Sequence, residues 1–425
     1  MSKVLFTILL IAIAGILSCD TASNIEPLDE SFFIKMYAGI GVGDQVGNDI
    51  IATSDGGLLI AGTSVNETDN TSEILLIKTD NKGSEEWKYG AALDLGPTSF
   101  SVAKSVIELP GSYLVGGTVD SAGVDRSILM EIGLGGNLLN ATLVQTDSLG
   151  TVYSNSLSKL TYNPNGTGIL VSGNTYHPHG PDSVNLNGFI RLYDLQLNPI
   201  ALLGSDIKYF GVEGDDYVTG AYEITDQNLI GDDKTKFMVF GHSDFRSLGG
   251  AKDFYYIGFN EFYQESPGMQ QVLNTGDEVS NYITQENNKF WMVGSSDGTQ
   301  MFLVGWEFKK VVTDWSPING SGEIGDKNDS EGKGVAVQAD NKYVVVGDVS
   351  FSTGNREIYL ARVGANFSFD SSDWPKTFGT SSSAYSSSAV IALSDGSIVI
   401  VGTADLEPIK KIVVIKTGPN GEMSF

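Results

Sequence analysis

The chain has 425 residues, with 52 acidic against 26 basic side chains and a formal net charge of −26 at pH 7. This charge repels phosphates and anionic lipid surfaces, which argues against nucleic-acid binding and against adsorption to a membrane surface. The 41% hydrophobic content allows a large core, and 51 glycines with only 12 prolines indicate many tight turns.

The first residues have the form of a bacterial export signal. Lys3 precedes an apolar run from Val4 to Leu17, which is too short for a comfortable transmembrane helix. The following "ILSC" resembles a lipobox, a pattern that in lipoproteins implies cleavage before the cysteine and lipid attachment to its sulfur. We expect a signal peptide over residues 1–18, lipidation at Cys19, and a polar tether within residues 19–31. The alternative is an ordinary signal peptide with a chance cysteine.

Cys19 is the only cysteine, so the mature chain has no intramolecular disulfide and no free thiol for catalysis or metal binding. A lipidated chain of this kind is anchored to the outer membrane and faces the periplasm or the cell exterior. We expect a monomer whose membrane contact is made through the lipid.

One short pattern then occurs seven times: an apolar run, a glycine and a polar residue. The glycines are spaced by 53 to 56 residues, except for one gap of 68 residues between the third and the fourth. This period exceeds that of WD40 units and suits four-stranded propeller blades with long loops. The seven glycines are Gly62, Gly117, Gly173, Gly241, Gly294, Gly347 and Gly402.

Each unit carries four strand signals. In the first unit they are "GNDIIATS", "LLIAGTS", "EILLIKTD" and "EEWKYG", with turns at "DGG" and "NKG". The last unit lacks its fourth strand, and residues 31–39, "SFFIKMYAG", resemble the missing piece. The sequence therefore predicts an all-β, seven-bladed β-propeller over residues 32–425, in which the N-terminal strand completes the last blade and closes the ring.

The repeat resembles the Bacteroidetes-type exported propeller repeats of form "DGG-apolar-GxT … IKTD-x-x-G-x-x-x-W". The resemblance covers nearly all of the mature chain, is clear in units one, six and seven, and is degenerate in units three to five. It implies the fold and export but no catalytic residues, because its Asp, Gly and Trp positions serve turns and packing. We expect inter-blade packing by three tryptophans: Trp87, Trp315 and Trp374.

The long gap marks insertions in units three and four, and they contain all three histidines of the chain. Imidazoles from adjacent loops are a way to hold a divalent transition metal, which polarises a substrate or activates water. The simpler interpretation is that "HPH" is a rigid solvated turn and that the third histidine ends a strand. The candidate ligands are His177, His179 and His242, with Asp182, Asp215 or Asp216 supplying an oxygen.

The same region suggests a binding surface, since aromatic side chains on loops stack on sugars or anchor peptides. The candidate aromatics are Tyr176, Tyr209, Phe210 and Phe245. Three arginines at similar loop positions are candidates for holding an anionic or carboxylate group: Arg246, Arg126 and Arg356. The simpler interpretation is that these residues form small cores under long loops and solubilising charges.

No specific catalytic motif appears, and the acidic loop at 326–332 lacks the glycine spacing of an EF-hand. The favoured hypothesis is a non-catalytic envelope binding lipoprotein without a cofactor, accessory to the capture of glycans or peptides, and not a nucleic-acid binder. One alternative is a metal-dependent polysaccharide lyase or hydrolase that uses the histidine cluster. Another is a structural envelope scaffold that contacts only protein partners.

Overall fold

The computed structural model describes most of the chain after the tether. The signal peptide, Cys19 and the tether lie outside the described residues, so those assignments stay predictions. No helix occurs among the described residues. This part of the chain therefore contains no helix that could span a membrane. The described residues are 32–40, 43–66, 71–91, 100–121, 123–145, 151–178, 185–202, 206–212, 214–224, 235–244, 251–265, 268–272, 276–286, 289–297, 300–307, 320–324, 330–338, 342–350, 356–364, 370, 373–380 and 382–423.

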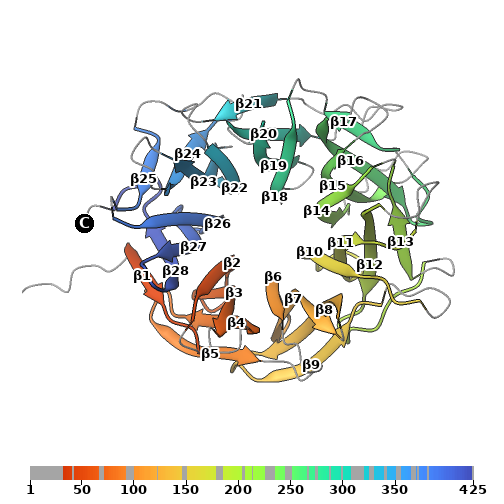
Figure 1. Ribbon diagram of the computed structural model, residues 1–425, viewed down its shortest axis with the longest axis horizontal. Coiled ribbons are helices and arrows are strands. Elements are labelled where there is room, and N and C mark those ends of the chain that lie inside the picture. Colours follow the sequence, from red (N-terminus) through yellow and green to blue (C-terminus); the bar gives the residue numbers. More distant parts are fainter. Residues whose placement is uncertain are drawn as a thin grey trace, which may run out of the picture.

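Twenty-eight strands form seven four-stranded antiparallel sheets, arranged as the blades of a ring (Figure 1). The predicted seven-bladed propeller is thereby confirmed. Within each blade the chain runs from the inner strand at the axis to the outer strand at the rim. Blades one to three comprise β2 (Gln45–Ala52), β3 (Leu58–Asn66), β4 (Thr71–Thr79), β5 (Glu85–Ala91); β6 (Ser101–Leu109), β7 (Ser112–Ser121), β8 (Val124–Gly133), β9 (Leu138–Leu143); and β10 (Asn155–Tyr162), β11 (Ile169–Thr175), β12 (Asn187–Tyr193), β13 (Ile207–Phe210).

The second half of the ring repeats this order and ends beside its beginning. Blades four to six comprise β14 (Asp216–Glu223), β15 (Thr235–Asp244), β16 (Lys252–Asn260), β17 (Gln270–Val272); β18 (Glu278–Glu286), β19 (Lys289–Ser296), β20 (Gln300–Glu307), β21 (Gly320–Ile324); and β22 (Ser330–Gln338), β23 (Lys342–Ser350), β24 (Arg356–Val363), β25 (Lys376–Phe378). Blade seven comprises β26 (Ala384–Ala392), β27 (Ile398–Asp405), β28 (Lys410–Thr417) and β1 (Phe33–Tyr37).

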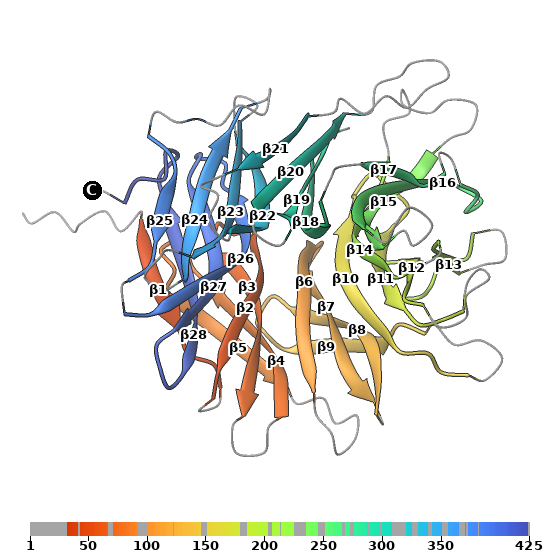
Figure 2. The same cartoon turned by 45° about the horizontal axis from the view of Figure 1, so that its top comes forward.

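The ring is closed by β1, as predicted. It pairs antiparallel with β28, and Figure 2 shows these two strands, from opposite ends of the chain, in one blade. Phe33 and Tyr37 point inward and are buried, and the Tyr37 hydroxyl donates to the carbonyl of Gly83 in blade one over 2.7 Å. The closing strand therefore joins the last blade to the first by both pairing and packing.

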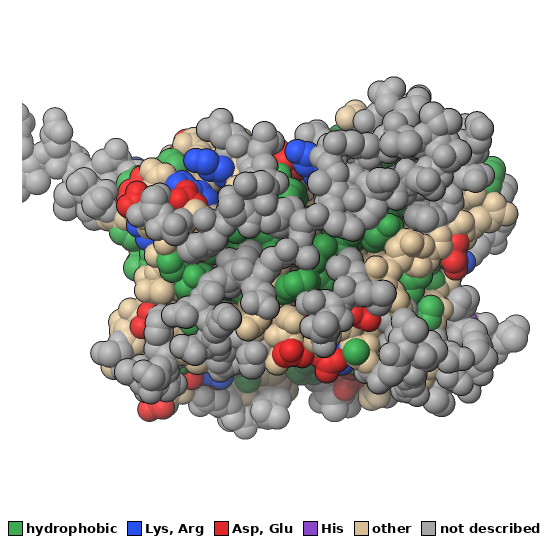
Figure 3. Space-filling model, turned by 90° about the horizontal axis from the view of Figure 1, so that it is seen from above, with side chains coloured by type: hydrophobic (Ala, Val, Ile, Leu, Met, Phe, Trp, Pro, Cys, Tyr) green, Lys and Arg blue, Asp and Glu red, His purple; other side chains and the backbone are tan. Residues whose placement is uncertain are grey.

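The hydrophobic core is divided among the blade interfaces. Each of seven clusters of buried side chains combines strands from two neighbouring blades. On the face seen in Figure 3, the described acidic side chains lie in several separate groups rather than in one continuous patch. Burial between blades thus holds the ring together while the surface stays charged.

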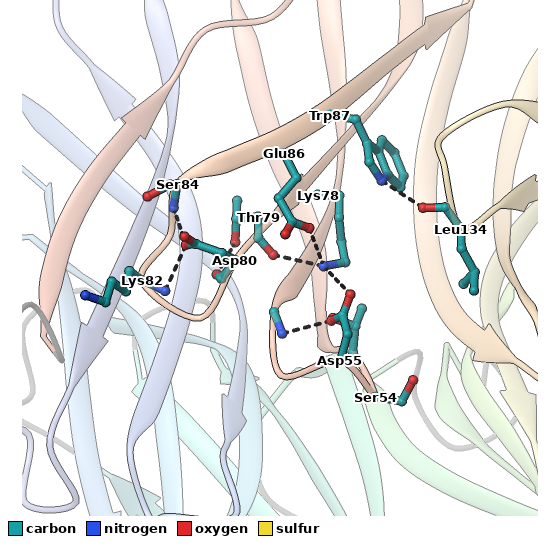
Figure 4. A network of polar contacts seen from close by, with 12 residues as sticks. Ser54, Asp55, Lys78, Thr79, Asp80, Lys82, Ser84, Glu86, Trp87 and Leu134 are labelled. Carbon is teal, nitrogen blue, oxygen red and sulfur yellow. Dashed lines mark hydrogen bonds and ion pairs between the residues drawn. The ribbon is translucent and has the colours of Figure 1, made fainter.

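The polar residues of the repeat are structural in blade one (Figure 4). Lys78 is only 1% exposed and forms ion pairs of 2.9 Å with both Asp55 and Glu86. Asp55 also accepts from the backbone N–H of Gly57, and Asp80 accepts from those of Lys82 and Ser84. These contacts fix the "DGG" and "NKG" turns against the "IKTD" strand, which gives the recurring pattern a structural role in this blade.

The tryptophans expected at blade interfaces lie there where they are described. Trp87 donates to the carbonyl of Leu134 in blade two over 3.0 Å and packs near Tyr113. Trp374 is 4% exposed within the core shared by blades six and seven. Trp315 lies outside the described residues.

The repeated glycine has a steric cause. Every inner strand has a β-bulge where it pairs with this glycine on the second strand. The bulge brings a backbone carbonyl oxygen so close that a Cβ added to any of the seven glycines would lie within 3.0 Å of it. Only a residue without a side chain fits, because backbone atoms cannot move aside as a side chain does.

The closing strand offers a matched pair of variants. Phe33 is 7% exposed and its neighbour Ile34 is 50% exposed. Phe33→Ala should lower the free energy of unfolding by about 3 kcal/mol, whereas Ile34→Ala should change it by less than about 0.5 kcal/mol. Urea denaturation measures both, and equal effects would contradict the orientation of β1. Deleting residues 31–39 should cost more still and cause aggregation, because it exposes the edge of β28.

The bulge account also predicts which glycines tolerate a methyl group. Gly294→Ala should destabilise the protein by about 2–3 kcal/mol, since the added Cβ meets the carbonyl of Val279. Gly135→Ala is the control, because its nearest neighbour would lie 3.8 Å away. Thermal unfolding of the two variants checks the difference. An unchanged Gly294→Ala would show that the bulge does not need glycine.

Candidate functional site

The bulges place one unpaired residue of each inner strand at the axis of the ring. Each such residue follows the position that pairs with the repeated glycine and has no cross-strand partner of its own. Bulges re-aim side chains, and here they do so at equivalent positions in all seven blades. The bulge residues are Asn48, Lys104, Ser158, Thr219, Asn281, Lys333 and Ser388.

Six of these seven residues line a cavity of about 360 Å³ on the axis. Its volume lies at the lower end of the range for small-molecule sites. Most of the lining residues are of polar type, and the charged ones are one aspartate, Asp49, and two lysines, Lys104 and Lys159. The cavity is the candidate site because it collects polar groups from several blades in one place.

Lys159 lines this cavity beside aromatic and acidic neighbours. Its ammonium group lies 4.1 Å from the centre of the Tyr282 ring. Burial lowers the pKa of Lys159, but Tyr282, Tyr222 and Asp49 more than reverse this and raise it above its usual value. Lys159 also lines a second cavity of about 290 Å³, together with the residues that follow it in β10. Lys159 therefore lies between the two cavities, and its raised pKa keeps the side chain positively charged.

Asp49 balances Lys159 and is itself well satisfied. Its carboxylate accepts from the backbone N–H groups of Val106 and Ile50, each over 3.0 Å. Burial raises the pKa of Asp49, while Lys159 and these donors oppose the rise. The carboxylate of Asp49 therefore joins blade one to blade two by a hydrogen bond and also serves as the counter-charge of Lys159.

Two asparagines at bulge positions present amide oxygens. The Nδ2 of Asn48 donates to Thr63 and to the carbonyl of Ala103, and the Nδ2 of Asn281 donates to Glu331 and to the carbonyl of Gly332. These bonds fix which end of each amide is nitrogen. The Oδ1 atoms accept no hydrogen bond from the described residues and remain available to a hydroxyl donor.

His242 lies in β15 and contributes one wall of the cavity. Its ring stacks on Tyr217 with the centroids 4.7 Å apart, and its Nδ1 accepts from the backbone N–H of Ser280 over 3.1 Å. The neutral ring must then carry its proton on Nε2. Burial, followed by the nearby Lys252, lowers the pKa of His242 to about 3.

The predicted metal-binding histidines have different surroundings. The His177 ring stacks on Tyr209 with the ring centroids 3.9 Å apart, and burial lowers the pKa of His177. His179 and Asp182 lie outside the described residues. A metal on the Nε2 of His242 would require the ring proton to move to Nδ1, where it would face the N–H of Ser280. Among the described residues no group of three or more His, Cys, Asp or Glu side chains is placed to hold a metal, and the metal site stays a prediction.

The two predicted aspartate ligands have other partners. Asp215 accepts from the backbone N–H of Leu186 over 2.9 Å, and Asp216 from that of Val212 over 2.8 Å. Asp216 is fully buried, and burial raises its pKa to about 7. Neither residue lines the axial cavity.

The predicted binding aromatics prove to be of different kinds. Tyr209 and Phe210 were expected on a loop, but they lie in β13, the outer strand of blade three. Phe210 is 1% exposed and packs in the core between blades three and four, so it is not the exposed loop aromatic that was expected. Tyr176 is 51% exposed and remains a candidate contact at the rim. Phe245 lies outside the described residues.

The described residues do not show the three predicted arginines brought together at one anion-binding site. Arg126 was expected on a loop but lies in β8 and is 8% exposed, while Arg356 is the first residue of β24. Arg246 lies outside the described residues. The cations that face the axis are instead lysines of inner strands, which sequence reasoning missed.

The similarity of the chain to known proteins is one of fold. No family model and no curated protein matches the chain. A PL25 ulvan lyase bound to -[GlcA(1-4)Rha3S]- is similar at a TM-score of 0.52 and 11% identity, covering 91% of this chain and 96% of that one. The propeller domain of the Trilobed protease from Pyrococcus furiosus gives 0.48 and 9%, covering 92% and 100%. A Dyadobacter fermentans protein of unknown function gives 0.46 and 9%, covering 90% and 98%.

The environment of His242 predicts how it titrates. Because its folded pKa is far below the unfolded value, the unfolded state takes up the proton first as the pH falls. The stability that His242 contributes is therefore complete above about pH 6.5 and is lost as the pH falls toward 3. Long-range ¹H–¹⁵N NMR should show a neutral ring protonated on Nε2 down to pH 5. A titration centred near pH 6.5 would contradict this environment.

Proposed function

We propose that the protein is a non-catalytic binding module of the cell envelope, which holds a small hydroxyl-rich ligand such as a sugar or the end of a glycan in its axial cavity. The observation that carries this proposal is the set of polar bulge residues that line the axial cavity. The amide oxygens of Asn48 and Asn281 are suited to accept from ligand hydroxyls. The ring of Tyr217 adds an aromatic surface of the kind on which sugars pack.

The titratable groups of the cavity support binding rather than chemistry. A general base works best with a pKa near the operating pH, and the pKa of about 3 makes His242 a weak one. Asp49 is occupied by two backbone donors and by its lysine. The alternative of a metal-dependent lyase or hydrolase stays a prediction that needs His179 and the insertions around it. Lipid anchoring through Cys19 is part of the proposal and would hold the ring at the outer membrane.

Filling the cavity tests where a ligand binds. Ser388 lines the cavity at a bulge position, and no hydrogen bond of its side chain is found among the described residues. Ser388→Trp should therefore occupy the cavity without removing a blade contact. The purified protein is titrated by calorimetry with a panel of neutral and acidic mono- and disaccharides. At least one should bind, and Ser388→Trp should weaken this binding by about tenfold or more, a loss of about 1.4 kcal/mol, because the indole occupies the space that the ligand needs.

Ser382→Trp is the matched control, since Ser382 is exposed and lies six residues earlier. It should bind as the unmodified protein does. Equal binding by Ser388→Trp would place the site elsewhere, with the rim around Tyr176 the next candidate. No binding by any sugar of the panel would overturn the proposed function.

A further inference from the structure

The charge of the axial cavity is opposite in sign to that of the chain. The chain has twice as many acidic as basic residues, whereas the described cavity lining has two lysines and one aspartate. A surplus of positive charge at the centre of an acidic protein is not needed for solubility. It therefore calls for a specific explanation.

Only one of the two lysines has a counter-charge. Lys159 lies with Asp49 and Tyr282, as described above. Lys104 has no ion pair or hydrogen bond among the described residues, and burial by the surrounding protein is the cause that lowers its pKa. Its side chain nevertheless remains open to the solvent within the cavity. Lys104 is thus a solvent-exposed cation of the cavity lining with no opposite charge beside it among the described residues.

The chain contains an internal comparison for this residue. Lys333 occupies the same bulge position in blade six. It forms an ion pair of 2.6 Å with Glu331 and is not part of the cavity lining. A lysine at a bulge therefore gains a carboxylate partner in one blade and lacks one in the other, where the cavity opens beside it.

We infer that the ligand of the axial cavity is anionic, a hydroxylated compound whose carboxylate or sulfate pairs with Lys104, as in an acidic sugar. This inference rests on the proposed function and names its substrate class. The hydroxyls of the ligand donate to the amide oxygens of Asn48 and Asn281. Its anionic group accepts a hydrogen bond from the ammonium group of Lys104. A charge-assisted hydrogen bond of this kind is about twice as strong as a neutral one.

The net charge of the protein opposes the approach of an anion but does not prevent its binding. Surface charges are screened beyond about 8 Å at physiological ionic strength, whereas a contact inside the cavity is screened much less. An anion beside Lys104 also favours its charged form and so offsets the effect of burial on its pKa. A cationic ligand would face Lys104 instead and would find no uncommitted carboxylate in the described lining.

Matched sugars test the inference. Glucose, glucuronate and glucose 6-sulfate share a ring and differ in their anionic group, and each is titrated into the protein by calorimetry at physiological ionic strength. At least one of the two anionic sugars should bind about tenfold or more tightly than glucose, as expected for a hydrogen bond to a charged group. Lys104→Met should remove this preference, Lys104→Arg should keep most of it, and Lys333→Met should leave it unchanged. Thermal unfolding of each variant confirms that it folds.

The outcomes separate the inference from the function beneath it. A preference for glucuronate alone identifies a carboxylate site, and a preference for the sulfate alone identifies a sulfate site. Equal binding of glucose and both acids would overturn the anionic inference and leave the sugar-binding function standing. A preference that survives Lys104→Met would overturn the role of Lys104. If none of these sugars binds and the wider panel also fails, the proposed function falls and the inference with it.

Discussion

One steric constraint recurs in every blade of this propeller: a backbone carbonyl of a bulged inner strand lies directly against a glycine of the second strand. The bulge needs the glycine, because any Cβ would collide with that carbonyl. The same bulge leaves one residue unpaired and turns it toward the axis. The repeat that builds the ring therefore also supplies the lining of its central cavity.

The bulge residues divide between building the ring and lining the cavity. The amide nitrogens of Asn48 and Asn281 donate to the next blade, so their amide oxygens, which accept no bond from the described residues, remain free to accept a hydrogen bond from a ligand. Asp49 joins two blades and neutralises Lys159. Lys104 has no such structural contact among the described residues. A charged group that lines the axial cavity and has no partner among the described residues is a better pointer to a ligand than exposure at the rim, where the first candidates were sought.

Much of the fold could be predicted from the sequence, because its signals are local and repeated. The glycine spacing indicates seven blades, and the likeness of residues 31–39 to an outer strand indicates the closure. The site was harder to find, because a bulge is an irregularity of pairing and leaves no mark in a single strand. Aligning the repeats on their glycines would have helped: Asn48, Lys104, Asn281 and Lys333 then fall 13 or 14 residues before them. Phe210 was misjudged because the length of an insertion hid the short outer strand within it.

A crystal structure of the protein soaked with glucuronate or glucose 6-sulfate would show whether the axial cavity binds an anionic sugar. We expect electron density for the sugar on the axis of the ring, with its anionic group beside the Lys104 ammonium and its hydroxyls toward Asn48 and Asn281. Density at the rim near Tyr176, with an axial cavity that holds only water, would contradict this expectation.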